Sequence, residues 1–358
     1  MLTFPMIRCF MLAMSDVNQA LLGDLLKATS RSFYLTLRVL PARVRPQIGL
    51  AYLLARTTDT IADTELIPLA QRLEALHKLR ERILGQSTAP LHFGALAQQQ
   101  GSPAEKILLE KVEAALALLP KLSPEDLKLV REVLSTITTG QELDLRRFAG
   151  ASAENVIALE TAAELDDYTF RVAGCVGGFW TKICRAHLFP RARLDEQQFI
   201  QDGIRFGKGL QLVNILRDLP ADLKIGRCYL PAQRLAEAKV WPEVLLSPAT
   251  EARFLPLFRE YLDKAESHLA AGWRYTNTLP FGQFRLRLAC AWPVLFGVKT
   301  IEKLRTAGVI DLQQRVKVSR AEVRQIIFRS VVRSPLAPAW RQLYAPAAKA
   351  VDSGRELA

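Results

Sequence analysis

Histidine and cysteine are scarce in this chain of 358 residues, and neither is arranged as a metal site or a disulfide framework requires. The four histidines show no ligand spacing, which argues against a histidine-based metal site. The five cysteines are odd in number, and none are spaced as zinc ligands. A chain of this length needs no disulfides for its stability, so we interpret the thiols as reduced and the protein as intracellular.

Long apolar runs, abundant aromatic residues and strand-like alternation are lacking as well. No stretch reaches ~18 uninterrupted apolar residues, so no membrane-spanning helix is predicted. Hydrophobic residues make up 49% of the chain but aromatic residues only 8%, a balance that favours helices over a β-sandwich. With no internal repeat and no interdomain linker, the sequence predicts a single all-α domain.

The charge balance favours an anionic partner. The net charge of +12 suits phosphates, nucleic acid or an acidic membrane surface. Zinc-finger and RNA-binding signatures are absent, and the aromatic residues do not alternate with basic ones, so no nucleic-acid partner is expected. Phosphates and an acidic membrane surface both stay open as partners.

The two ends of the chain differ from its middle. Residues 1–14 are apolar but lack the basic start and the cleavage site of a signal peptide, so they are predicted to be a disordered or mis-annotated extension. Residues 15–334 are expected to fold, and residues 335–358 to form a poorly ordered tail. Apolar periodicity predicts helices at about 16–40, 46–64, 68–85, 124–146, 160–188, 195–222, 248–278, 284–304 and 317–333.

Two aspartate pairs stand out, each directly after an apolar, helix-periodic run. Asp59 and Asp63 form the first pair, and Asp218 and Asp222 the second. Residues four apart lie on one face of a helix, about 5–6 Å apart, so each pair would repel itself unless a cation were bound. Mg²⁺ prefers one or two carboxylates together with substrate phosphates. Two such pairs facing each other would hold a diphosphate through bridging Mg²⁺, with Mn²⁺ as an alternative.

One such pair alone is a weak signal, because roughly nine in ten would be solvated surface charges. The glycine-rich stretch at residues 174–178 is also ambiguous. Each glycine weakens a helix by about 1 kcal/mol relative to alanine, which a helix accepts where a bulky group approaches its backbone. Either a ligand or a closely packed neighbouring helix would satisfy this condition.

Taken together, the motifs resemble the squalene/phytoene synthase family, from about Leu22 to Arg333. Four further blocks appear in the family's order beside the first aspartate pair: Ser30-Arg31-Ser32-Phe33, Tyr168 with Val172-Ala173-Gly174, Gln211 through Asp222, and Arg227. The resemblance implies a single helical bundle around a deep central cavity, with residues 15–334 as the catalytic domain. It also implies Mg²⁺-dependent head-to-head condensation of two prenyl diphosphates, with farnesyl diphosphate as the expected substrate.

The resemblance assigns roles residue by residue. Asp59, Asp63, Asp218 and Asp222 would bind Mg²⁺, and Tyr168 would lie near the reacting carbons. The substrate diphosphates would contact Ser30, Arg31, Arg56, Gln211, Asn214, Arg217 and Arg227. These residue types suit the chemistry, since guanidinium groups and metal ions stabilise a leaving diphosphate, and a dry cavity protects the carbocation from water.

The product is less well defined than the reaction class. The Asp-Thr-x-x-Asp form of the first motif, the Cys290-Ala291-Trp292-Pro293 block and the basic run at residues 316–320 look like squalene synthases, which reduce the intermediate with NADPH. Lys317 and Arg320 would then bind the NADPH phosphates. Phytoene, dehydrosqualene and presqualene diphosphate synthases remain alternatives, because Ser319 stands where a second cation is usual and no Rossmann glycine loop is present.

Location and partners follow from the same resemblance. The C-terminal membrane anchor of eukaryotic members is missing, which indicates a bacterial form that is cytoplasmic, with peripheral contact at the inner membrane face left open. A monomer is expected. The basic helix at 317–333 could touch anionic lipid, although a solvated face is the simpler interpretation. A non-catalytic, lipid-binding relative is the remote alternative. It would be expected to have lost aspartates or arginines that this chain retains.

Overall fold

Almost all of the regular structure in the computed structural model is helical, and the described part of the chain comprises residues 20–30, 33–245, 247–307 and 316–344. The all-α prediction is confirmed. The helices gather in two compact units, residues 1–145 and 146–358, and each is described separately. The predicted extension at residues 1–14 lies outside the described residues. That residues 15–334 form one catalytic domain stays a prediction.

The first unit is built around α4 (Arg45–Ala62), which packs against α2, α3, α5, α7 and α8. Its leucines Leu50, Leu53 and Leu54 are buried, and full burial of such a side chain contributes about 1.5–3 kcal/mol. The other elements of this unit are η1 (Ala20–Leu25), α2 (Leu26–Ser30), α3 (Phe33–Val39), α5 (Leu69–Leu84), α6 (Gly94–Gln98), α7 (Pro103–Glu110), α8 (Val112–Leu116), η2 (Leu119–Lys121) and α9 (Pro124–Arg147).

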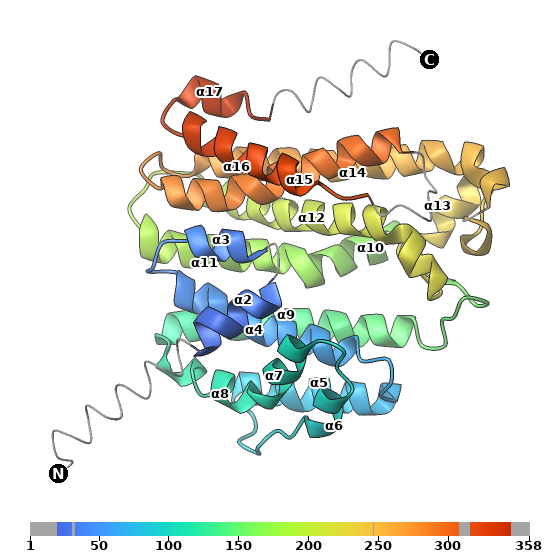
Figure 1. Cartoon of the computed structure of the whole chain (residues 1–358), viewed down its shortest axis with the longest axis horizontal. Helices are drawn as coiled ribbons and strands as arrows, with labels where there is room; N and C mark the ends of the chain where they lie inside the picture. The colour runs from blue at the N-terminus through green and yellow to red at the C-terminus, as the bar shows by residue number, and fades with distance from the viewer. Residues whose placement is uncertain (1–19, 31–32, 246, 308–315, 345–358) are drawn as a thin grey trace. The chain divides into compact units, whose positions relative to one another are not determined.

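The second unit is built around α12 (Glu196–Lys224). Figure 1 shows α12 between α11 (Cys175–Leu188) and α14 (Glu251–Thr278), and α12 packs against both. α15 (Phe284–Thr306) lies against α14 and α16 (Arg320–Arg333). The remaining elements are β1 (Ile157–Ala158), α10 (Ala162–Thr169), η3 (Phe170–Gly174), β2 (Arg227–Cys228), α13 (Ala232–Glu237), η4 (Pro242–Val244), η5 (Pro248–Thr250) and α17 (Ala337–Arg341).

Three local expectations need correction. The stretch expected as helix at 16–40 is divided, in its described part, into η1, α2 and α3. A two-stranded parallel ladder joins β1 and β2 although no strand was predicted. Residues 337–341 of the expected disordered tail form α17, because Trp340 is 1% exposed and stacks on Trp273 at 5.6 Å. Residues 345–358 lie outside the described part.

Candidate active site

The first aspartate pair lies at the end of α4, in the first unit. Pro46 occupies the first turn of the helix, where its missing N–H costs nothing. Near the other end, the buried hydroxyls of Thr57 and Thr60 bond to carbonyls one turn earlier, at 2.9 and 2.8 Å. Asp63 caps the helix, and its N–H donates to the carbonyl oxygen of Asp59 at 2.9 Å. The backbone therefore fixes both aspartates on the last turn.

The electrostatics of this pair favour a bound cation. Lost hydration, and then repulsion from Asp63, raise the pKa of Asp59 to about 7, while Arg56 and Gln141 oppose that rise. The Arg56 Nη1 lies 3.7 Å from the Asp59 Oδ2, and the Gln141 Nε2 donates to the Asp59 Oδ1. Arg56 is also ion-paired with Glu105, so its charge is shared. A divalent cation would relieve the repulsion that these neighbours only partly offset.

Several polar atoms of the first unit are buried without a hydrogen-bond partner among the described residues. They include the Arg56 Nε, the Gln141 Oε1 and the Ser30 Oγ. Ser30 ends α2 and is 3% exposed, whereas Arg31 lies outside the described residues. Buried polar groups are nearly always hydrogen-bonded, so these atoms are available to a ligand or its water.

In the second unit, α12 carries the other aspartate pair on a polar strip. Asp195 caps the start of the helix by accepting from the Gln198 N–H at 2.9 Å. Further along, Leu212, Val213, Ile215, Leu216, Leu219 and Leu223 are buried, and five polar residues beside and between them are half-buried. Those polar residues are Gln211, Asn214, Arg217, Asp218 and Asp222. Gln211, Asn214, Asp218 and Asp222 follow a spacing of three or four, so they lie along one side of the helix.

Side-chain contacts join this strip to Tyr168 on α10. The Gln211 Nε2 donates to the Tyr168 hydroxyl at 3.5 Å, and the Asn214 Nδ2 donates to the Gln211 Oε1 at 3.5 Å. The ring of Tyr168 stacks on Tyr229, with ring centroids 4.6 Å apart. Arg217 holds Asp218 with two hydrogen bonds of 3.0 and 2.5 Å. The predicted residues Tyr168, Gln211 and Asn214 are thus brought together.

The two-stranded ladder positions Arg227. Gly226 lies in the turn between α12 and β2 and has a φ of +80°. A Cβ at this position would lie 2.2 Å from the Ser152 carbonyl oxygen. The next residue, Arg227, pairs with Ile157, and the Ile157 N–H donates to the Gly226 carbonyl at 2.8 Å. Only glycine tolerates both the conformation and the close approach. The ladder therefore fixes the backbone position of Arg227, which is predicted to contact the substrate diphosphate.

The glycine-rich stretch serves helix packing. A Cβ on Gly177 would lie 1.9 Å from the Gly203 carbonyl oxygen, and one on Gly207 would lie 2.2 Å from the Ala173 carbonyl oxygen. Two backbones therefore touch where η3 and α11 cross α12. Of the two explanations left open by the sequence, close helix packing is the one that the structure shows.

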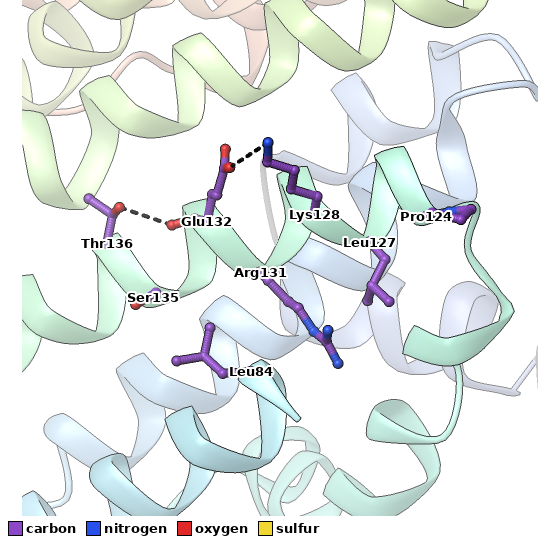
Figure 2. Close-up of a pocket in the computed structure, with 8 residues that line it drawn as sticks. All are labelled: Leu84, Pro124, Leu127, Lys128, Arg131, Glu132, Ser135 and Thr136. Atoms are coloured by element: carbon purple, nitrogen blue, oxygen red, sulfur yellow. Dashed lines mark hydrogen bonds and ion pairs between the residues drawn. The ribbon is translucent and has the colours of Figure 1, made fainter. Parts of the chain in front are cut away.

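A pocket of about 650 Å³ opens between the end of α5 and the first half of α9. Figure 2 shows its lining, which includes the ion pair of Lys128 and Glu132 at 3.9 Å. The lining consists of Leu84, Pro124, Leu127, Lys128, Arg131, Glu132, Ser135 and Thr136. None of the predicted site residues lines it. The deep central cavity stays a prediction.

The two aspartate pairs offer the oxygen donors that a magnesium site requires. Among the described residues, no three histidine, cysteine or acidic side chains converge as a metal site. A cation at either pair would therefore take its remaining ligands from water and substrate phosphate, which is how Mg²⁺ commonly binds. The all-oxygen donors and the raised pKa of Asp59 agree with such an ion.

Lys317 and Arg320 flank the start of α16. Both side chains are exposed, and Ser319 between them caps the helix in a reciprocal pair with Glu322. The Lys303 Nζ, on α15, bonds to Glu322 at 2.8 Å and to the Lys317 carbonyl at 3.1 Å. Two cations beside the positive end of a helix dipole suit an anionic ligand.

Sequence reasoning missed Gln141, Glu105 and Tyr229. Gln141 lies in the polar Gly140-Gln141-Glu142 stretch of an otherwise apolar face, which was the available signal. Glu105 pairs with Arg56 across 49 positions, which no local pattern indicates. Tyr229 carried no signal, because stacking partners far apart in sequence cannot be paired without a fold.

The family model for squalene/phytoene synthases matches residues 26–322 of this chain. The chain belongs to the squalene/phytoene synthase family. Members of this family are prenyltransferases of isoprenoid biosynthesis.

Relatives within the family are named for different reactions. A bifunctional lycopene cyclase/phytoene synthase of Arthroderma gypseum is 28% identical over 71% of this chain and 41% of its own length. A squalene synthase of Saccharomyces cerevisiae is 24% identical over 86% of this chain and 66% of its own length. A presqualene diphosphate synthase of Rhodopseudomonas palustris is 28% identical over 71% of this chain and 77% of its own length. The chain thus spans less than two thirds of the length of the first two of these relatives.

Solved structures share the fold. The protein abbreviated TcSQS, solved with the ligand E5700, superposes with a TM-score of 0.72 at 20% identity, over 91% of this chain and 90% of its own. A squalene synthase from Alicyclobacillus acidocaldarius superposes with a TM-score of 0.57 at 18% identity, over 83% of this chain and 97% of its own. The fold of this squalene/phytoene synthase family member is therefore that of squalene synthases. Among the described helices, none is both long and apolar enough to cross a bilayer.

Proposed function

We propose that this chain is a squalene synthase. It joins two molecules of farnesyl diphosphate head to head into presqualene diphosphate, releasing one diphosphate and one proton. It then converts presqualene diphosphate and NADPH into squalene, a second diphosphate and NADP⁺. The observation that carries the proposal is the polar strip of α12, where Asp218 and Asp222 share one side with Gln211 and Asn214.

The charged residues would bind and orient the two diphosphates. Mg²⁺, held by Asp59 and Asp63 and by Asp218 and Asp222, would neutralise the leaving diphosphate. Arg217 and Arg227 present planar guanidinium groups, which suit bidentate contacts with phosphate oxygens. The Arg217 guanidinium donates two hydrogen bonds to Asp218. We infer that a substrate diphosphate and Asp218 would both contact this guanidinium.

The aromatic residues would stabilise the carbocation and shield it from water. Tyr168 is 9% exposed and lies against Tyr229, so its ring and hydroxyl are largely shielded from water. A ring face stabilises a nearby cation, and exclusion of water protects that cation from conversion to an alcohol. Gln211 holds the Tyr168 hydroxyl and would keep the ring in one orientation.

The two exposed cations at the start of α16 favour squalene, whose synthesis needs a reductant, over the other products of the family. NADPH would supply the hydride that quenches the rearranged cation. Lys317 and Arg320 are exposed beside the capped start of α16, where a phosphate would meet both cations and the helix dipole. Phytoene, dehydrosqualene or presqualene diphosphate synthesis would need no such site.

The test of the proposed reaction is diphosphate release from farnesyl diphosphate by the purified full chain. We expect release with Mg²⁺, its loss when a chelator removes the metal, and its return when Mg²⁺ or Mn²⁺ is added in excess. Release that persists in chelator would mean that the aspartate pairs do not act through a metal. No release with any prenyl diphosphate would contradict the proposed reaction.

A further inference from the structure

The outward face of α16 exposes large apolar side chains. Phe328 is 69% exposed, Val332 57% and Val331 47%. The opposite side of the helix is anchored, because the Trp292 Nε1 on α15 donates to the buried Ser330 Oγ at 2.9 Å. The helix therefore cannot turn these residues inward. Only a surface outside the unit could therefore bury these apolar side chains.

Apolar exposure continues onto the neighbouring segments. Leu336 before α17 is 63% exposed, and Phe281 and Phe284 at the α14–α15 turn are 56% and 52% exposed. Arg287 ties these segments together, since its guanidinium lies 5.3 Å from the Phe281 ring and 4.6 Å from the Trp340 ring of α17. Figure 1 shows α16 and α17 next to each other, and they pack together. We call the outward side of α16, with Leu336, Phe281 and Phe284, the α16 face.

The charges around this face are positive. Arg324, one turn before Phe328, is exposed, as are Arg329 and Arg341. The acid of α16, Glu322, is paired with Lys303 and with the cap at Ser319. Arg287 is 6% exposed, and among the described residues no carboxylate forms an ion pair with it and its Nε has no hydrogen-bond partner. Buried cations normally have a carboxylate partner, so the positive charge of Arg287 is not neutralised by an ion pair with any described residue.

Arginines beside exposed aromatic and aliphatic side chains suit the interface of an anionic bilayer. Lysine and arginine near such a surface are attracted to its negative potential, and apolar side chains enter the boundary between headgroups and acyl chains. A second copy of the chain fits less well, because a symmetric contact would place like-charged arginines against each other.

We propose that the α16 face docks this enzyme on an anionic lipid bilayer. Phe328 and Val332 enter the bilayer boundary, and Arg324, Arg329 and Arg341 contact headgroup phosphates. The proposal goes beyond the reaction and does not depend on it, since binding needs neither substrate nor turnover.

The test is co-sedimentation of the purified full chain with vesicles. One set contains phosphatidylcholine alone, and the other contains phosphatidylcholine and phosphatidylglycerol in equal parts. We expect sedimentation with the mixed vesicles, and loss of most of it at high salt. The double variant Phe328→Ser/Val332→Ser should lose binding, and Arg324→Gln should lower the partition coefficient about fivefold.

Matched controls lie elsewhere in the same unit. Trp241 is 58% exposed and Arg259 is exposed, so Trp241→Ser and Arg259→Gln should bind as the unaltered chain does. Circular dichroism and light scattering of every variant check its fold and mass. The proposal is overturned if the unaltered chain stays in the supernatant with mixed vesicles, or if the Phe328→Ser/Val332→Ser variant binds equally well. A mass that falls from dimer to monomer in that variant, with vesicle binding unchanged, would make the face a dimer interface instead.

Discussion

Replacing Asp218 with asparagine is expected to lower the rate of diphosphate release at least about a thousandfold. The substitution removes a carboxylate charge that would hold Mg²⁺ at the place where the leaving diphosphate develops its negative charge. The substitution keeps the size of the side chain and leaves an oxygen that can still accept from Arg217, which now donates to both carboxylate oxygens. The helical circular dichroism should therefore stay unchanged. The measurement is steady-state diphosphate release at saturating Mg²⁺.

Glu196→Gln is the matched control for this experiment. Glu196 is an exposed acid in the first turn of the same helix, so its loss removes one negative charge from α12 away from the polar strip. Its rate should remain within about twofold of the unaltered chain, since a first-turn acid affects mainly helix stability. Near-native turnover by the Asp218→Asn variant would show that the metal assignment is wrong.

Gly177→Ala is expected to destabilise the second unit by about 3 kcal/mol. The added methyl group would lie 1.9 Å from the Gly203 carbonyl oxygen, a backbone atom that no side-chain rotation can move. The crossing of α11 and α12 must then open. Thermal unfolding followed by circular dichroism should show a midpoint roughly 10 °C lower.

The adjacent residue provides the control. A Cβ on Gly178 would lie 3.6 Å from the Ile204 Cγ1, which is an ordinary contact. Alanine also favours a helix over glycine by about 1 kcal/mol, so Gly178→Ala should leave the midpoint unchanged or raise it. Equal midpoints for the two variants would mean that the close approach of the helices does not limit the stability of this unit.

The principal helices could be predicted from the sequence because their apolar periodicity is a local signal. The predicted stretches at 46–64 and 195–222 correspond to α4 and α12, and both carry their aspartate pair near the end. The resemblance assigned Tyr168 and Gln211 to one active site, but their direct contact could not be predicted, since periodicity relates only residues a few positions apart.

What the sequence could not predict depends on pairing between distant segments. β1 and β2 are two residues each, too short for alternation to be visible, and they exist because Ile157 meets Arg227. Gln141 contacts Asp59 across 82 positions, and Trp340 is buried by Trp273. Such contacts arise from tertiary packing, which overrides local propensity.

Product analysis of one incubation tests the central claim most directly. The purified full chain is mixed with farnesyl diphosphate and Mg²⁺, with and without NADPH, and the extracted lipids and diphosphates are identified by mass spectrometry. We expect squalene only when NADPH is present, and presqualene diphosphate when it is absent. Dehydrosqualene formed regardless of NADPH would contradict the squalene synthase assignment. So would the absence of any product from farnesyl diphosphate while a parallel incubation with the C20 diphosphate yields phytoene.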